Sequence, residues 1–251
     1  MNFKEKIEAS TQTRNSKIVL ALDLPPQKRE LLLNKATEIL ESVEPYVCAV
    51  KINRHLVLPL GLFNDLQKIV KRAEDYGLPT IMDCKINDIG ATNRVVAQHY
   101  FDAGFDAVTA NPFVGWEQGL KPVFEAAKKN GKGVILLVYM SHKAAYEGYG
   151  QTVKTESGKL VPQYAVFAEK ALKWKADGAV VGATYPEKIR EIHQMLREEV
   201  PIYSPGIGVQ GGKIREALNA GARFLIVGRS ITLSEEPGEN AKKLRDLANR
   251  V

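Results

Sequence analysis

The sequence contains little cysteine, no leader-like segment and no long apolar run. Cys48 and Cys84 are its two cysteines among 251 residues, and they do not have metal-ligand spacing. Two cysteines allow one disulfide at most, which is fewer than a secreted protein usually has. The N-terminal segment MNFKEKIEASTQTRNS has no apolar core of a secretory signal. No stretch approaches the roughly 20 apolar residues that span a bilayer. We therefore expect a protein of the reducing cytoplasm.

Runs of lysine and arginine with interleaved aromatic residues are absent as well, which disfavours a nucleic-acid partner. The formal net charge of +6 still favours anionic partners in a general way. A phosphorylated small molecule explains that excess as well as a nucleic acid does, and scattered surface lysines explain it better than either. Hydrophobic content of 45% and charged content of 25% are typical of a soluble globular protein.

Apolar stretches typical of buried strands alternate with helical patterns along the whole chain. The expected strands are residues 17–24, 46–52, 78–83, 105–110, 133–140, 177–183, 201–208 and 222–230. Asp23, Lys51 and Asp83 follow one another at intervals of 28 and 32 positions, the length of one βα unit. Eight such units predict a single-domain (β/α)₈ barrel over residues 1–251. A doubly wound open sheet is the alternative, but no GxGxxG motif follows the first strand.

Two segments lie outside this repeat. Residues 3–12 are expected to form a short amphipathic helix through Phe3 and Ile7, within an N-terminal extension over residues 1–15. Residues 142–163 form a long polar connection after the fifth strand. Loops of this length are either functional or disordered. The connection is therefore interpreted either as a surface insertion or as a lid over the barrel mouth.

Three charges, Asp83, Lys85 and Asp88, lie close together at the junction of an apolar strand and a helical pattern. Asp83 and Lys85 are two positions apart, so on a regular strand they share a face. Such charges are costly to desolvate unless they satisfy each other or take part in chemistry. A structural salt bridge and a catalytic site therefore both remain open at this stage.

The ends of the other expected strands also carry polar residues. Asp23, Lys51 and Ser141 end the first, second and fifth strands, and active sites of such barrels lie at the carboxyl ends of the strands. Solvation of the rim explains any one of these residues but explains the set poorly. The glycine-rich segment SPGIGVQGG and the pair Gly228-Arg229 follow the last two strands, where these barrels commonly bind phosphate. Arg229 offers a forked donor to a phosphate dianion.

The segments ALDLP, VKIN, DCKINDIGAT, YMSH, SPGIGVQGG and IVGRSI occur in this order. Together they resemble the orotidine 5'-phosphate decarboxylase family, and the shorter prokaryotic and archaeal branch more than the eukaryotic one. The resemblance runs from the first strand to the eighth. It implies decarboxylation of orotidine 5'-monophosphate to uridine 5'-monophosphate, without a metal or organic cofactor.

The resemblance also implies roles for individual residues. Lys51, Asp83, Lys85 and Asp88 would form an alternating network of charges. Lys85 would protonate C6 of the pyrimidine as carbon dioxide leaves, with Asp83 beside the scissile carboxylate. Asp88 and Thr92 would reach the neighbouring subunit's site, so that a homodimer is needed for activity.

Further residues would bind the rest of the substrate. Asp23 and Lys51 would hold the ribose hydroxyls, and Ser141 would contact the pyrimidine. Gln210 would link the pyrimidine region to the phosphate, which Arg229 and nearby backbone amides would hold. Pro205 and Gly228 complete the implied set of substrate-binding residues.

Three alternatives remain open. The first is a decarboxylase or aldolase of the same superfamily that uses magnesium and a sugar phosphate. Such relatives carry an acidic residue where this chain has Lys51. The second is a catalytically silent phosphate-binding barrel, and the third is a nucleic-acid binder.

Overall fold

Eight parallel strands close into a barrel, as the repeat of βα units predicts. The computed structural model describes residues 1–208 and 211–251. Around the barrel the strand order is β1-β2-β3-β4-β5-β8-β9-β10, all paired in parallel. The strands are β1 Ile18–Ala21, β2 Ala49–Asn53, β3 Thr80–Ile86, β4 Ala107–Ala110, β5 Gly133–Tyr139, β8 Gly178–Val181, β9 Ile202–Pro205 and β10 Phe224–Val227. The predicted fold class is confirmed.

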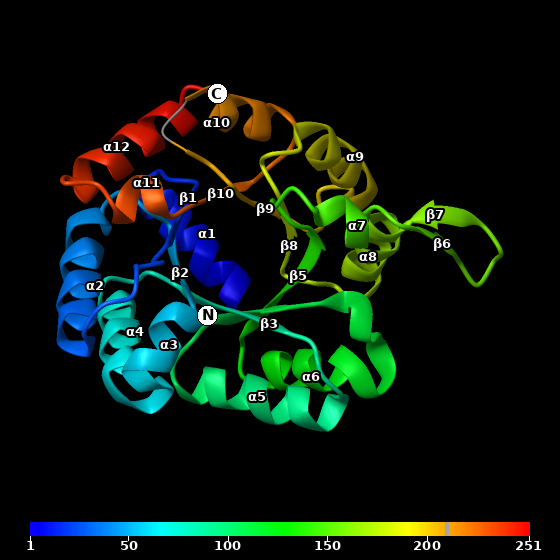
Figure 1. Ribbon diagram of the computed structural model, residues 1–251, viewed down its shortest axis with the longest axis horizontal. Helices are drawn as coiled ribbons and strands as arrows, with labels where there is room; N and C mark the ends of the chain where they lie inside the picture. The colour runs from blue at the N-terminus through cyan, green and yellow to red at the C-terminus, as the bar shows by residue number, and fades with distance from the viewer. Residues whose placement is uncertain (209–210) are drawn as a thin grey trace.

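The helices form a ring outside the barrel (Figure 1). They are α2 Arg29–Val43, α3 Arg54–Leu60, α4 Leu66–Asp75, α5 Gly90–Asp102, α6 Lys121–Lys129, α8 Gln163–Lys173, α9 Pro186–Leu196, α10 Gly211–Asn219, α11 Arg229–Thr232 and α12 Pro237–Ala248, with short irregular turns η1 Gly61–Asp65, η2 Pro112–Val114 and η3 Trp116–Leu120. Burial follows from this arrangement, because strands enclosed by helices have no face left for water. All four residues of β1, IVLA, and all four of β10, FLIV, are buried.

An N-terminal helix, α1 (Phe3–Arg14), covers the amino-terminal end of the barrel. Asn2 and Glu5 form a capping box that starts this helix. Phe3 and Ile7 are buried in the cluster of side chains that fills the barrel interior. The predicted helix is present, and it continues to Arg14, two residues beyond the expected end.

The long connection after β5 is folded rather than irregular. It contains the short helix α7 (Ala145–Tyr149) and an antiparallel hairpin of β6 (Thr152–Lys154) and β7 (Leu160–Pro162). Figure 1 shows this hairpin projecting sideways from the ring of helices. The hairpin therefore does not cover the barrel mouth in this structure, and a lid role stays a prediction.

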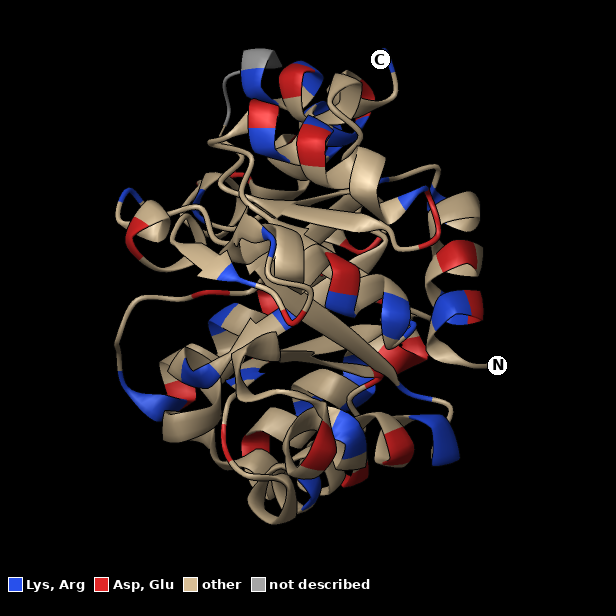
Figure 2. Cartoon of the chain, turned by 90° about the vertical axis from the view of Figure 1, so that its right-hand side faces the viewer, with Lys and Arg blue, Asp and Glu red and all other residues tan. Residues whose placement is uncertain are grey.

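Charged residues are distributed over the outer helices, where basic and acidic residues are interspersed (Figure 2).

Both cysteines are free and buried, and burial raises the pKa of each thiol to about 12. Among the described residues, no helix combines the length and apolar character needed to cross a membrane.

Candidate active site

Two lysines from neighbouring strands bind one carboxylate at the carboxyl ends of β2 and β3. Lys51 donates from Nζ to Asp83 Oδ2 over 2.7 Å, and Lys85 donates from Nζ to Asp83 Oδ1 over 2.7 Å. The Lys51 side chain is 8% exposed, whereas that of Lys85 is 37% exposed. Lys51 is therefore the more enclosed of the two lysines, and Lys85 is the more exposed.

Asp83 is held as a carboxylate by its two partners. Burial raises the pKa of Asp83, but the ammonium groups of Lys51 and Lys85 lower it by more, so that this pKa lies well below its ordinary value. The site therefore carries a fixed negative charge between two positive ones at neutral pH. Fixed charges of this kind can stabilise charge that develops on a bound molecule.

A bulge in β3 brings Lys85 toward Asp83. The pairing of β3 with β4 is regular at Met82–Val108 and resumes at Ile86–Ala110, so three residues of β3 lie opposite Thr109 alone. Lys85 has φ +50°, in the left-handed region that side chains other than glycine seldom adopt. The expected shared face of Asp83 and Lys85 is confirmed by their contact, but a bulge produces it rather than a regular pleat.

Asp23 lies two residues beyond the end of β1, at the same end of the barrel. Its Oδ1 accepts a hydrogen bond from Asn53 Nδ2 over 2.5 Å, and its Oδ2 lies 4.0 Å from Lys51 Nζ. Asn53 also accepts from the backbone N–H of His55 at the start of α3. Sequence reasoning missed Asn53, although its place two residues after Lys51 on one strand is a usable signal.

A cavity of about 630 Å³ opens beside these charges. Six of the predicted residues line it, namely Asp23, Lys51, Ser141, Pro205, Gly228 and Arg229. Lys213 and Ser230, which are not among the predicted site residues, also line it. Asp83 and Lys85 are not among the lining residues and are linked to the cavity through Lys51. Residues at or just after the ends of β1, β2, β5, β9 and β10 thus converge, as expected for the carboxyl-end mouth of a barrel.

The remaining predicted residues are arranged differently. Asp88 and Thr92 are exposed, and the ion pairs described for Lys51 and Lys85 do not include Asp88. The side chain of Asp88 instead accepts from the backbone N–H of Ile89 over 2.7 Å. Within this chain, the charge network therefore contains three of its four predicted members. Gln210 lies outside the described residues.

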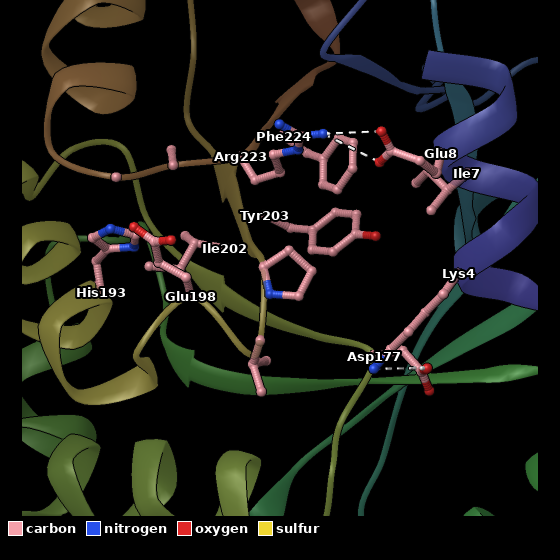
Figure 3. A pocket seen from close by; sticks show the side chains of 14 residues that line it. Lys4, Ile7, Glu8, Asp177, His193, Glu198, Ile202, Tyr203, Arg223 and Phe224 are labelled. Carbon is pink, nitrogen blue, oxygen red and sulfur yellow. Dashed lines mark hydrogen bonds and ion pairs between the residues drawn. The ribbon is translucent and has the colours of Figure 1, made fainter. Parts of the chain in front are cut away.

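A second cavity, of about 520 Å³, lies at the opposite end of the barrel (Figure 3). Ion pairs border it on two sides, with Arg223 on Glu8 at 3.1 Å and Lys4 near Asp177 at 3.9 Å. Tyr203 reaches into the barrel from this side and stacks on Phe224. None of the predicted site residues that the structure describes lines this cavity. The predicted site is therefore at the carboxyl-end mouth.

Comparison with known proteins gives a consistent result. Residues 16–244 match the model of the family described as "Orotidine 5'-phosphate decarboxylase / HUMPS family". Orotidine 5'-phosphate decarboxylase of Pyrococcus furiosus is 37% identical over 229 residues, covering 90% of this chain and 95% of that protein. The enzyme of the same name from Methanosarcina mazei is 34% identical over 233 residues, covering 93% and 95%.

Solved structures are similar over the same range. A crystal structure of orotidine 5'-phosphate decarboxylase from Pyrococcus horikoshii OT3 has a TM-score of 0.75 at 35% identity, covering 93% of this chain and 100% of that one. The enzyme from Methanocaldococcus jannaschii, complexed with the inhibitor BMP, has a TM-score of 0.76 at 35% identity, covering 93% and 99%. OMP decarboxylase of Leishmania donovani, at 24% identity and a TM-score of 0.86 over 100% and 98% of the chains, shares the fold.

Proposed function

The chain belongs to the orotidine 5'-phosphate decarboxylase / HUMPS family and is a carboxy-lyase, and on that premise we propose that it converts orotidine 5'-monophosphate to uridine 5'-monophosphate with Lys85 as the proton donor. The observation that carries this proposal is the pair of 2.7 Å contacts that fix Asp83 between Lys51 and Lys85. Lys85 is the more exposed of the two lysines, at 37%, which supports its assignment as the proton donor.

Decarboxylation leaves an electron pair on carbon, and the pyrimidine ring itself offers no adjacent group to delocalise it. A fixed ammonium stabilises that charge as it develops and then transfers a proton to the carbon. In this proposal Lys85 performs both tasks, and Asp83 lies next to the carboxylate that departs. Lys51 holds Asp83 and, because it lines the cavity together with Asp23, meets a ribose hydroxyl. These residues perform the reaction without a cofactor in this proposal.

The far end of the substrate would bind across the cavity from the charged cluster. Arg229 and Lys213 both line the cavity and both carry a positive charge that suits a phosphate dianion. Ser141, Pro205 and Gly228 line the space between. Binding energy from the phosphate, far from the reacting carbon, can be used to order the site around the ring.

A homodimer is part of the proposal. Asp88 and Thr92 are exposed on the segment after β3, next to the exposed side chain of Ile89. Phe113, which follows β4, is also a large exposed apolar residue, at 70%. Exposed apolar side chains rimmed by polar ones are typical of a protein interface. A second copy seated here would let Asp88 and Thr92 reach its site, as the family resemblance implies. The cytoplasmic location likewise stays a prediction.

The test is loss of the orotate-ring absorbance after addition of orotidine 5'-monophosphate, in the presence of EDTA. Lys85→Ala should remove nearly all turnover while its circular dichroism spectrum stays that of the folded protein. Lys132→Ala is the matched control, because it breaks an ion pair of 3.3 Å with Asp106 at the amino-terminal end of the barrel. Full turnover by Lys85→Ala contradicts the assigned role. Turnover abolished by EDTA supports the magnesium-dependent alternative instead.

A further inference from the structure

Thr109 is a polar residue in the otherwise apolar strand β4, whose sequence is AVTA. It is 2% exposed, and it is the single residue of β4 that faces the bulge of Asp83, Cys84 and Lys85. A buried hydroxyl is costly unless it is hydrogen-bonded. Valine has nearly the same shape and lacks that cost. The presence of threonine at this position therefore calls for a role of the hydroxyl itself.

The hydroxyl of Thr109 makes two hydrogen bonds, one to each charged residue of the bulge. It accepts from the backbone N–H of Lys85 over 2.9 Å and donates to Asp83 Oδ1 over 3.0 Å. The same Oδ1 accepts from Lys85 Nζ over 2.7 Å. These contacts close a ring that runs from the Lys85 backbone through Thr109 and Asp83 back to the Lys85 ammonium. Thr109 thus binds the Lys85 backbone directly and the Lys85 ammonium through Asp83.

The backbone of Lys85 depends on this contact. A residue at φ +50° is held there only when its surroundings determine the conformation. Among the side chains of the described residues, Thr109 alone accepts a hydrogen bond from the Lys85 N–H. The carbonyl of Thr109 also accepts from Cys84 Sγ over 3.4 Å, which fixes the middle of the bulge. Thr109 therefore contacts every residue of the bulge.

We propose that Thr109 is a positioning residue that fixes the Lys85 ammonium and the Asp83 carboxylate for proton transfer. The inference rests on the proposed function of Lys85. Without the hydroxyl, the Lys85 N–H and Asp83 Oδ1 each lose a partner. The bulge then loses two of the hydrogen bonds that hold its shape. A displacement of about 1 Å at a reacting group can lower a rate by a factor on the order of 10².

The experiment compares Thr109→Val, Thr109→Ser and the wild type, with Thr80→Val as a matched control. Thr80 is also a buried threonine, 1% exposed, but it lies at the opposite end of β3. We expect Thr109→Val to lower kcat on the order of 10²-fold and to change KM for orotidine 5'-monophosphate less than about threefold, because the phosphate and ribose contacts remain. Thr109→Ser, which keeps the hydroxyl, should stay within about fivefold of the wild-type kcat, and Thr80→Val should not change it.

Two kinetic results overturn the inference. One is a kcat of Thr109→Val within about threefold of wild type, and the other is an equal loss in Thr109→Ser, since the hydroxyl would then not be responsible. A crystal structure of Thr109→Val provides a readout that needs no turnover. Lys85 should leave the left-handed region, and its ammonium should move away from Asp83. If Lys85 and its ammonium both stay in place, the inference fails. This readout does not depend on turnover, so it tests the inference even if the wild type is inactive on this substrate. Inactivity of the wild type would contradict the proposed function alone.

Discussion

The buried ion pair between Lys51 and Asp83 leads to a prediction about stability that is independent of any substrate. Lys51→Met replaces the ammonium with an apolar group of similar length, inside a site where Lys51 is 8% and Asp83 12% exposed. Asp83 then keeps two partners, Lys85 at 2.7 Å and the Thr109 hydroxyl at 3.0 Å. The variant should therefore fold, but with a lower free energy of unfolding.

The expected magnitude follows from the geometry. Unit charges separated by 2.7 Å attract by about 6 kcal/mol at an effective dielectric constant of about 20. Desolvation offsets much of this, and removing one member of a buried pair costs about 3–5 kcal/mol in proteins. Because Lys85 and Thr109 still bind Asp83, we expect about 2–3 kcal/mol for Lys51→Met. For a protein of this size that corresponds to a fall in Tm of roughly 4–12 °C.

The reverse truncation should cost more. Asp83→Asn leaves the Lys51 ammonium with Asp23 at 4.0 Å as its acidic neighbour and leaves two ammonium groups facing each other. We expect about 3–5 kcal/mol for this variant. The double variant, Lys51→Met with Asp83→Asn, carries no unpaired buried charge from this pair. Its free energy of unfolding should exceed the value obtained by adding the two single effects by at least about 1 kcal/mol.

The assay is urea unfolding at pH 7, followed by circular dichroism, for the wild type, both single variants and the double variant. Strict additivity within about 0.5 kcal/mol would refute the reasoning, because it would mean that the two charges do not interact. Acid titration gives an independent check. The folded-state pKa of Asp83 is lowered, so its contribution is complete above the unfolded pKa of about 3.9 and is lost as the pH falls further. Asp83→Asn should flatten the pH dependence of stability below about pH 4.

Two further predictions concern the substrate and the partner subunit. Arg229→Ala should raise KM for orotidine 5'-monophosphate by roughly 10- to 100-fold in initial-rate measurements, which is the usual contribution of hydrogen bonds to a charged group. An equal loss with the nucleoside, which lacks the phosphate, would contradict the assigned contact. Mixing Lys85→Ala with Asp88→Ala subunits should restore part of the turnover that each lacks alone, because a hybrid dimer contains one complete site. Absence of rescue in subunit-exchanged samples would mean that Asp88 acts within its own chain.

The barrel itself could be predicted because its signals are local and repeated. Each expected strand is an apolar run that ends near a polar residue, and the intervals from Asp23 to Lys51 to Asp83 match one βα unit. The observed strands are shorter at most ends. For example, β1 stops at Ala21, so that Asp23 lies in the following loop. Such ends depend on pairing with neighbouring strands, which apolar content does not report.

The connection after β5 shows the limit of composition. A polar segment of this length predicts a loop, yet α7 and the β6–β7 hairpin form within it. The hairpin pairs only three residues of each strand, from Thr152 to Lys154 and from Leu160 to Pro162, and its side chains are exposed or half-buried. Periodicity of apolar residues identifies strands with a buried face. A hairpin without one leaves no such signal.

Asp83 and Lys85 show most clearly where local rules stop. Spacing by two residues places their side chains on one face of a regular strand, but also about 7 Å apart along it. The observed contact of 2.7 Å forms instead at a bulge, in which Lys85 has a positive φ. Neither residue specifies that bulge. Its cause lies on β4, where Thr109 supplies an acceptor for the Lys85 N–H and a donor for Asp83. The sequence of β3 therefore contains the charged groups of the site, whereas a hydroxyl more than twenty positions away determines their geometry.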